Sequence, residues 1–288
     1  MQLLVITGPT ASGKSSLALE KAVQLNGEII SVDSMQLYRG IEIGTAQPTV
    51  EERAAVPHHL VGIYDFSVRA EVFTFCSLAD AAIRDIQSRG KLPILAGGTG
   101  FYLKALLGGL DDLPADPALR KELDDRFDSD EKESALHEEM AKLDTAALDR
   151  WKDCRRRLIR AMEVKILSGR SILELQSGMP QTCRYSGVES IFIMPESDVL
   201  KERIALRCDA MLKAGWIEEA EQAISDGLLG SPTAHQALGY KLIAGYLAGE
   251  YPYDLLREKL ITATWQFARR QRTYLRHQLD FLKKPVQN

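Results

Sequence analysis

The sequence predicts an α/β fold, in which a parallel sheet carries helices on both faces and a helical insertion is added to the core. Three observations lead to this prediction. Strand and helix segments alternate over the first hundred residues, the strands are apolar almost throughout, and an Asp- and Glu-rich segment follows at residues 111–150. Apolar strands of this kind are typical of parallel sheets that are buried on both faces. At 288 residues, 45% of them hydrophobic, the chain can bury a full core and an appendage.

The boundaries of the elements follow from hydrophobic periodicity and from breaks at Gly and Pro. The predicted strands are residues 3–7, 28–32, 91–96 and 191–194, and the predicted helices are residues 15–25, 73–88, 200–214, 217–225 and 253–282. We expect residues 1–110 to form the first part of the core, residues 111–150 the helical insertion, and residues 151–288 the rest of the core with the C-terminal helices. A solvated surface excursion without function is the alternative for the insertion.

The first strand leads directly into a glycine-rich loop and then into a helix. Its pattern, Gly-x-x-x-x-Gly-Lys-Ser, in this strand–loop–helix context predicts a P-loop and a P-loop NTPase-like core. Backbone N–H groups of such a loop and of the helix start bind phosphates, the lysine adds a mobile positive charge, and the Ser15 hydroxyl suits Mg²⁺. The chain therefore binds a di- or triphosphate, through Gly8, Pro9, Thr10, Ala11, Ser12, Gly13, Lys14 and Ser15.

Two further strand ends carry candidate site residues, because ligands of open α/β sheets bind at the carboxyl ends of the strands. Asp33 follows the second strand, where a carboxylate can bind Mg²⁺ or accept a proton from a nucleophile. A turn or N-cap aspartate is the alternative. Residues 97–100, Gly-Gly-Thr-Gly, follow the strand at 91–96 and allow a ligand to approach the backbone closely, with glycines that serve only tight packing of strand and helix as the alternative. No aspartate ends that strand, which argues against an ATPase.

The net charge of −4 argues against a protein that coats nucleic acid nonspecifically, but basic residues gather at three places in the chain. Arg203 and Arg207 lie four residues apart on one predicted helix face and can bind a diphosphate, or form surface ion pairs. The other two clusters suit phosphate contacts and base stacking, with a solvated charged face as the alternative. They consist of Arg155, Arg156, Arg157 and Arg160, and of Arg269, Arg270, Arg272, Arg276 and His277 with Tyr274 among them.

The remaining composition bears on location. No charged leader precedes an apolar segment, no apolar run approaches the length needed to cross a bilayer, and the four cysteines lack metal-ligand spacing. We expect a cytoplasmic protein without a membrane partner.

An ordered set of short motifs closely resembles the bacterial-type tRNA dimethylallyltransferases, the tRNA isopentenyltransferase family. The motifs keep the family's order over nearly the whole chain, so the set is far more specific than the P-loop alone. They are residues 8–15, Asp33-Ser-Met-Gln36 with Tyr38, Ile43-Gly-Thr-Ala46 with Pro48, Pro57-His-His-Leu60, Gly97-Gly-Thr-Gly100 with Tyr102, Arg160-Ala-Met-Glu-Val164, Gly239-Tyr-Lys241 and Ala268-Arg-Arg-Gln271.

The resemblance implies transfer of a dimethylallyl group from dimethylallyl diphosphate to N6 of the adenine just 3′ of the anticodon in tRNA. It implies that the P-loop, Mg²⁺ and Arg207 hold the diphosphate and that Asp33 is the general base; Lys14 joins them as a catalytic residue. It further implies tRNA contacts, to the target adenine and its anticodon stem-loop, from Asp33, Ser34, Met35, Gln36, Thr99, Arg120, Arg156, Arg157, Leu158, Ile159, Arg160, Gln236, Gly239, Tyr240, Lys241, Arg269, Arg270, Gln271 and Arg276. A monomer is compatible with a substrate of this size.

Three departures from the family pattern accompany the motifs: Glu42 and Gln47 replace the usual aspartate and lysine, and Trp265 stands where an arginine is common. Three other functions remain open. A P-loop kinase of small molecules would explain the P-loop and the fold, an adenylate isopentenyltransferase would need no tRNA contacts, and a non-catalytic RNA-binding protein would have no use for Lys14 or Asp33.

Overall fold

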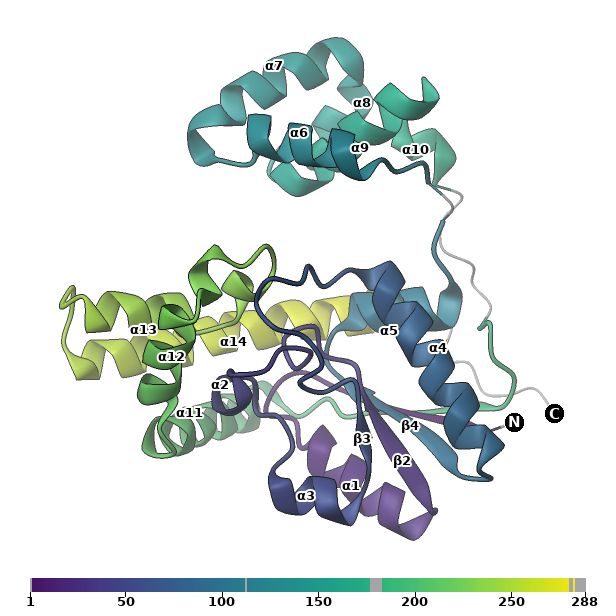
Figure 1. The fold of residues 1–288 in the computed structure, drawn as a ribbon, viewed down its shortest axis with the longest axis vertical. Helices are drawn as coiled ribbons and strands as arrows, with labels where there is room; N and C mark the ends of the chain where they lie inside the picture. The colour runs from purple at the N-terminus through teal and green to yellow at the C-terminus, as the bar shows by residue number, and fades with distance from the viewer. Residues whose placement is uncertain (1, 112, 177–182, 280–281, 283–288) are drawn as a thin grey trace. The chain divides into compact units, whose positions relative to one another are not determined.

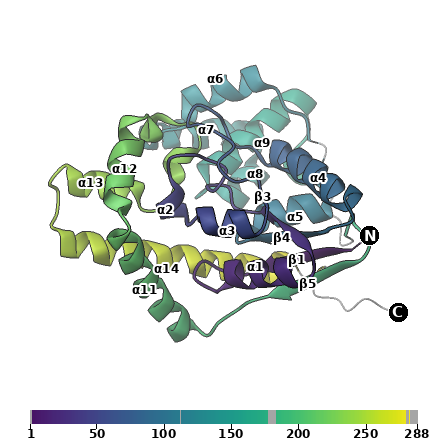
Figure 2. The same ribbon diagram turned by 60° about the horizontal axis from the view of Figure 1, so that its bottom comes forward.

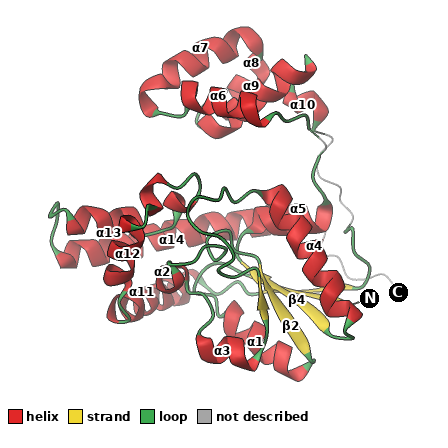
Figure 3. Ribbon diagram, viewed as in Figure 1, coloured by secondary structure: helices red, strands yellow, loops and turns green. Residues whose placement is uncertain are grey.

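The computed structural model describes residues 2–111, 113–176, 183–279 and 282, and contains two compact units. The first unit consists of Met1–Gly108 and Gln181–Asn288, and the second of Gly109–Pro180. The first unit is an α/β domain and the second is entirely helical over its described residues (Figures 1 and 3). The predicted fold class is confirmed.

A five-stranded parallel sheet forms the centre of the first unit, with the strand order β3-β2-β4-β1-β5. Figure 1 labels β2, β3 and β4, and Figure 2 also shows β1 and β5. The predicted late strand lies somewhat earlier than expected, because Val188 already pairs with Leu3 at the start of β1. The two-residue strand β3 was too short for the pattern to reveal. The strands are β1 (Leu3–Thr7), β2 (Gly27–Ser31), β3 (His58–His59), β4 (Leu92–Gly97) and β5 (Val188–Phe192).

Helices cover the sheet as the apolar strands require. Alternate strand residues, such as Leu4 and Ile6, pack with Ala18 of α1 (Lys14–Gln24) and with Val56, which follows α3 (Val50–Ala55). Successive side chains of a strand point to opposite faces, and α4 (Val72–Ser88) packs against β2 and β4. Both faces of the sheet are therefore buried.

A long helix, α14 (Tyr253–Gln278), runs through the first unit and contacts α11, α13 and α5 (Figures 1 and 2). It ends before residue 282, where the sequence predicted its end, and residues 280 and 281 lie outside the described part. The other helices of this unit are α2 (Glu42–Thr45), α5 (Gly100–Gly108), α11 (Ser197–Lys213), α12 (Trp216–Ser225) and α13 (Tyr240–Leu247), with short 3-10 turns at Leu228–Gly230 and Ala234–Gln236.

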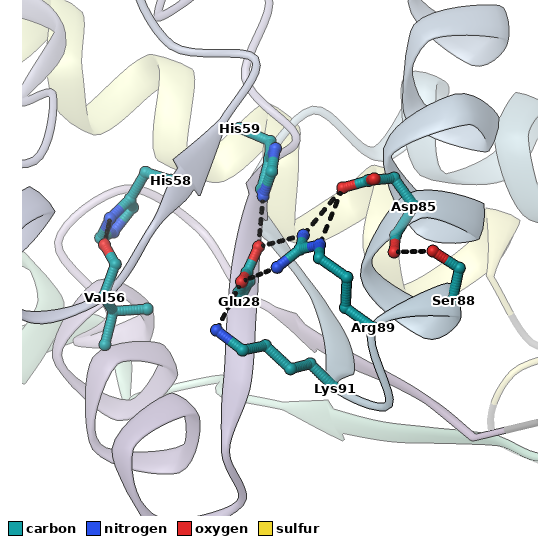
Figure 4. A network of polar contacts seen from close by, with 8 residues as sticks. All are labelled: Glu28, Val56, His58, His59, Asp85, Ser88, Arg89 and Lys91. Carbon is teal, nitrogen blue, oxygen red and sulfur yellow. Dashed lines mark hydrogen bonds and ion pairs between the residues drawn. The ribbon is translucent and has the colours of Figure 1, made fainter.

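A buried carboxylate ties several elements together at the amino end of β2 (Figure 4). Glu28 is 1% exposed and pairs with Arg89, Lys91 and His59, which come from the end of α4, the start of β4 and β3. The Arg89 guanidinium is the main reason that the pKa of Glu28 lies far below its ordinary value. This network lies at the end of the sheet opposite the P-loop and stabilises the edge of the fold.

The second unit contains five α-helices and a 3-10 turn in its described residues: α6 (Pro117–Phe127), the 3-10 turn (Asp130–Lys132), α7 (Glu133–Leu143), α8 (Thr145–Trp151), α9 (Arg155–Ser168) and α10 (Ile172–Leu175). It extends beyond residue 150, where the sequence predicted the end of the insertion, because α9 buries Leu158 and Met162 in the same core as Phe127 and Met140. In the part of the chain that is described, no helix is long and apolar enough to cross a membrane.

Candidate active site

Three loops meet at the carboxyl edge of the sheet, because β2, β4 and β1 are neighbours. They are the P-loop after β1, residues 32–36 after β2, and residues 98–100 after β4. The Thr99 N–H donates to the Val32 carbonyl at 3.2 Å, and the Ser34 N–H donates to Thr99 Oγ1 at 3.4 Å. A Cβ on Gly97 would lie 2.0 Å from the Val32 oxygen, so only glycine allows this approach. The predicted grouping of Asp33, Thr99 and the P-loop at one edge agrees with this topology.

The P-loop encloses a cavity at the start of α1. The Ser12 N–H donates to the Pro9 carbonyl, and Ala11 and Gly13 both have positive φ angles, of 61° and 93°. Among the described residues, no side chain caps α1, and its first turn contains no acidic group. The exposed N–H groups and the helix dipole therefore favour an anion. The cavity has a volume of about 390 Å³ and is lined by Ala11, Ser12, Gly13, Lys14, Ser15, Ser16, Arg203 and Arg207.

Positive charge is concentrated in this cavity. Burial and the nearby Arg207 lower the pKa of Lys14 from 10.5 to about 8, and Asp33 partly offsets that effect. Burial also lowers the pKa of Arg207, and Asp33 again acts in the opposite direction. Arg203, which the sequence paired with Arg207 as a candidate for binding a diphosphate, donates to the Ser12 carbonyl at 3.2 Å. A diphosphate would provide the negative charge that these cations lack.

Asp33 lies within electrostatic reach of both Lys14 and Arg207. Its Oδ1 accepts hydrogen bonds from the N–H groups of Met35 at 2.9 Å and Gln36 at 3.4 Å, which fixes the carboxylate at the strand end. The described residues give Oδ2 no hydrogen-bond partner, so this oxygen can accept a proton from a substrate. The turn that was the alternative for Asp33 is present, and it leaves one oxygen available.

Several residues that were predicted to contact tRNA have side chains bound inside the protein instead. The Gln36 amide donates to the carbonyls of Thr45 and Ala46 and accepts from Ser31 Oγ. The Tyr240 hydroxyl is buried and donates to Glu219, whose carboxylate also accepts from the N–H groups of Ile43 and Gly44. Gly239 packs closely against Trp216, where an added Cβ would lie 2.4 Å from the indole. These residues support the loop beside the site, and the sequence did not reveal Glu219.

The helical unit shows the same difference for its candidate RNA contacts. Leu158 and Ile159 are at most 2% exposed and belong to the core of the unit. Arg120 and Arg160 both pair with the buried Glu163, and Arg160 also donates to the Pro114 carbonyl. Motif position alone does not distinguish these inward side chains from outward ones. The predicted contacts whose side chains are exposed are Arg156, Arg157, Gln236, Lys241, Arg269, Arg270 and Arg276.

Trp265, the departure from the family pattern, belongs to an apolar cluster beside the P-loop. It packs with Leu200 and Ile204 of α11, and Ala11 contacts the same cluster. The ammonium of Lys201 lies 5.3 Å from the centre of its ring. The tryptophan therefore replaces a cation with packing, while Lys14, Arg203 and Arg207 supply the charge of the cavity.

Comparison with known proteins identifies the family of this chain. The family model described as IPP transferase matches residues 36–278, and the model described as isopentenyl transferase matches residues 1–61. The tRNA dimethylallyltransferase of Methylococcus capsulatus is 46% identical over 96% of this chain and 90% of its own length. The chain belongs to the tRNA dimethylallyltransferase family.

Solved structures of family members show the same fold. A tRNA isopentenylpyrophosphate transferase from Bacillus halodurans has a TM-score of 0.67 at 37% identity, covering 96% of this chain and 87% of that one. A eukaryotic dimethylallyltransferase acting on tRNA has a TM-score of 0.78 at 28% identity, covering 95% of this chain and 69% of that one. The family resemblance inferred from the motifs is thereby confirmed over nearly the whole chain.

Proposed function

We propose that this chain transfers the dimethylallyl group of dimethylallyl diphosphate to N6 of the adenine just 3′ of the anticodon in tRNA, and releases diphosphate. Family membership supports the enzyme class and the tRNA substrate. The observation that carries the chemistry is a carboxylate, Asp33, fixed beside a cationic P-loop cavity. A kinase would need the P-loop but not this loop after β2.

The donor is held in this proposal by the P-loop. The first-turn N–H groups of α1, Lys14, Arg203 and Arg207 bind the diphosphate, whose negative charge rises as the C–O bond to the allylic carbon breaks. Groups placed where charge develops in the transition state lower the barrier directly. The allylic carbon becomes cationic and resonance-stabilised, so the diphosphate can leave without a covalent intermediate on the protein.

The acceptor is activated by Asp33. The adenine N6 forms the new bond to the allylic carbon, and its proton passes to Asp33 Oδ2. An exocyclic amine is a weak nucleophile, so a carboxylate that accepts its proton as the N6–C bond forms lowers the barrier to attack. Ser34, Met35 and Thr99 border the base, whereas Gln36 supports the loop from behind. A loop base can leave its stack at a cost of a few kcal/mol in general.

Mg²⁺ fits this site as a companion of the diphosphate. The described residues contain no group of three or more His, Cys, Asp or Glu that could hold a metal alone. Mg²⁺ is commonly bound by one or two protein oxygens with substrate phosphates and waters, and the exposed Ser15 hydroxyl at the start of α1 is such a ligand. When bound, the ion supplies charge neutralisation for the leaving diphosphate.

RNA binding is assigned to the exposed basic residues of both units. Arg269, Arg270 and Arg276 on α14 and Arg156 and Arg157 on α9 are exposed cations that suit phosphates. With Gln236 and Lys241 they make up the proposed contacts to the anticodon stem-loop. The proposal also includes a monomer acting in the cytoplasm, where the bacterial tRNA substrate is found.

A transfer assay tests the function. Labelled dimethylallyl diphosphate and Mg²⁺ are incubated with the chain and unmodified tRNA, with the same tRNA carrying guanine at the target position, or with AMP or ATP. We expect label only in the adenine-containing tRNA. Label in the mononucleotide alone would make the chain an adenylate isopentenyltransferase, and no transfer in any tube would contradict the proposal.

A further inference from the structure

One buried side chain on α14 joins the two loops that hold the two substrates. Gln271 is 8% exposed, and its Oε1 accepts a hydrogen bond from the N–H of Thr10, in the P-loop, at 2.8 Å. Its Nε2 donates to the carbonyl of Gly98, in the loop after β4, at 3.1 Å. Thr10 and Gly98 belong to neighbouring strand ends, so Gln271 connects the donor side of the site with the acceptor side.

The backbone around Gln271 is built for this close approach. A Cβ on Gly98 would lie 2.5 Å from Gln271 Nε2, and a Cβ on Gly100 would lie 2.5 Å from the ring of Tyr274. Between these two glycines stands Thr99, whose hydroxyl accepts from the N–H of Ser34. A displacement of Gly98 therefore reaches the loop that carries Asp33.

The polarity of the link requires an amide. The Thr10 N–H can only donate and the Gly98 carbonyl can only accept, so the bridging group must offer one acceptor and one donor at this length. A methionine has similar length and offers neither. A glutamate provides both only when its carboxyl is protonated.

We propose that Gln271 is a positioning residue, which fixes the P-loop against the loop after β4 that carries Gly98 and Thr99. In this way it sets the distance between the allylic carbon and the adenine N6. This inference rests on the proposed function. It reassigns Gln271 from an RNA contact to the interior of the site, while Arg270, its exposed neighbour on the same helix, keeps its part in binding RNA. Reaction rates depend steeply on such distances, and a misplacement of about 1 Å can cost about 100-fold.

The test compares Gln271→Met, Gln271→Glu and Arg270→Ala with the wild-type chain. Single-turnover transfer rates at saturating tRNA and donor are measured together with the tRNA Kd by filter binding. Gln271→Met should lower the single-turnover rate by about 100-fold and change the tRNA Kd by less than about threefold. Arg270→Ala should do the reverse and weaken tRNA binding with little effect on the saturated rate.

Gln271→Glu separates a specific link from general loss of structure. When the carboxyl of this variant is ionised, a carboxylate faces the Gly98 carbonyl, and the transfer rate should be as low as that of Gln271→Met. Burial raises the pKa of such a carboxyl, so its rate relative to wild type should recover as the pH falls from about 8 to about 5.5, while Gln271→Met stays slow throughout.

Two results would overturn the proposal. One is a Gln271→Met variant whose tRNA Kd rises while its saturated rate is unchanged, which would make Gln271 an RNA contact. The other is a Gln271→Glu variant that follows Gln271→Met at every pH. Wild-type activity is measured first, so failure of the proposed function would show as no transfer in any chain and is distinct from both results.

Discussion

Lys14 should give the proposed donor site a pH dependence whose sign and size follow from its surroundings. Its pKa is about 8 without ligand, because burial and Arg207 disfavour its charge more than Asp33 supports it. A bound diphosphate favours the charged form and returns the pKa toward its ordinary value of 10.5. We therefore expect affinity for the donor to be full well below pH 8 and to fall as the pH rises through 8, because the free protein must then take up a proton to bind.

The magnitude follows from the two pKa values. With the free and bound values about 2.5 units apart, the donor Kd should rise about 10-fold from about pH 7 to about pH 9, or about 1.4 kcal/mol. Calorimetric titration with dimethylallyl diphosphate and Mg²⁺, in buffers of different ionisation enthalpy, measures the Kd and the proton uptake together. Uptake should approach one proton near pH 9.

A matched pair of variants isolates the lysine. Lys14→Met should bind the donor weakly and lose this pH dependence, because the titrating group is gone. Lys21→Met, on the same helix but outside the cavity, should keep the wild-type dependence. A donor Kd that is flat from pH 7 to pH 9 in the wild-type chain, or a Kd that rises equally steeply with pH in Lys14→Met, would show that Lys14 is not the titrating group.

Four further outcomes follow from other residues. Asp33→Asn should bind tRNA and donor normally and lose about 100- to 10,000-fold in single-turnover rate; a near-normal rate would remove Asp33 as the base. Arg207→Ala should weaken donor binding and slow transfer, whereas an effect on tRNA affinity alone would contradict its placement in the cavity. Arg270→Ala should reduce by about one the slope of log tRNA affinity against log salt; an unchanged slope would place it outside the interface. Glu28→Ala should lower the free energy of unfolding by about 1–3 kcal/mol, because it removes the buried carboxylate that accepts hydrogen bonds from Arg89, Lys91 and His59, while these partly exposed side chains can still be solvated. Since the pKa of Glu28 is lowered by folding, wild-type stability should decline as the pH falls below its ordinary value of 4.5, and urea denaturation should show less of that decline in Glu28→Ala.

The sequence predicted those features that depend on local pattern. The P-loop is a contiguous motif, and Asp33 and Thr99 directly follow strands, so the parallel topology alone brings them to one edge. Four of the five strands were predicted within a few residues, because buried parallel strands are apolar throughout. Such features need no knowledge of distant contacts.

Side-chain direction could not be predicted in the same way. Gln271 and Arg270 are neighbours in one basic motif, yet the first is buried between two loops and the second is exposed. Tyr240 and Arg160 likewise stand in motifs that suggested RNA contacts, but both side chains bind carboxylates of the protein. The partner of Tyr240 is Glu219, which is distant from its motif, and the partner of Arg160 is Glu163, which lies in the same motif. Which residue of a helix faces inward depends on packing with elements far away in the sequence.

The chemical identity of the product tests the proposed function most directly. tRNA incubated with the chain, Mg²⁺ and unlabelled dimethylallyl diphosphate is digested in one portion to nucleosides and in another to oligonucleotides, both portions are examined by mass spectrometry, and the diphosphate released is measured in parallel. We expect adenosine carrying one dimethylallyl group on N6, in the oligonucleotide that contains the position 3′ of the anticodon, in an amount equal to the diphosphate released. Diphosphate release without a modified nucleoside, or the same nucleoside yield from Asp33→Asn at the same rate, would contradict the proposal.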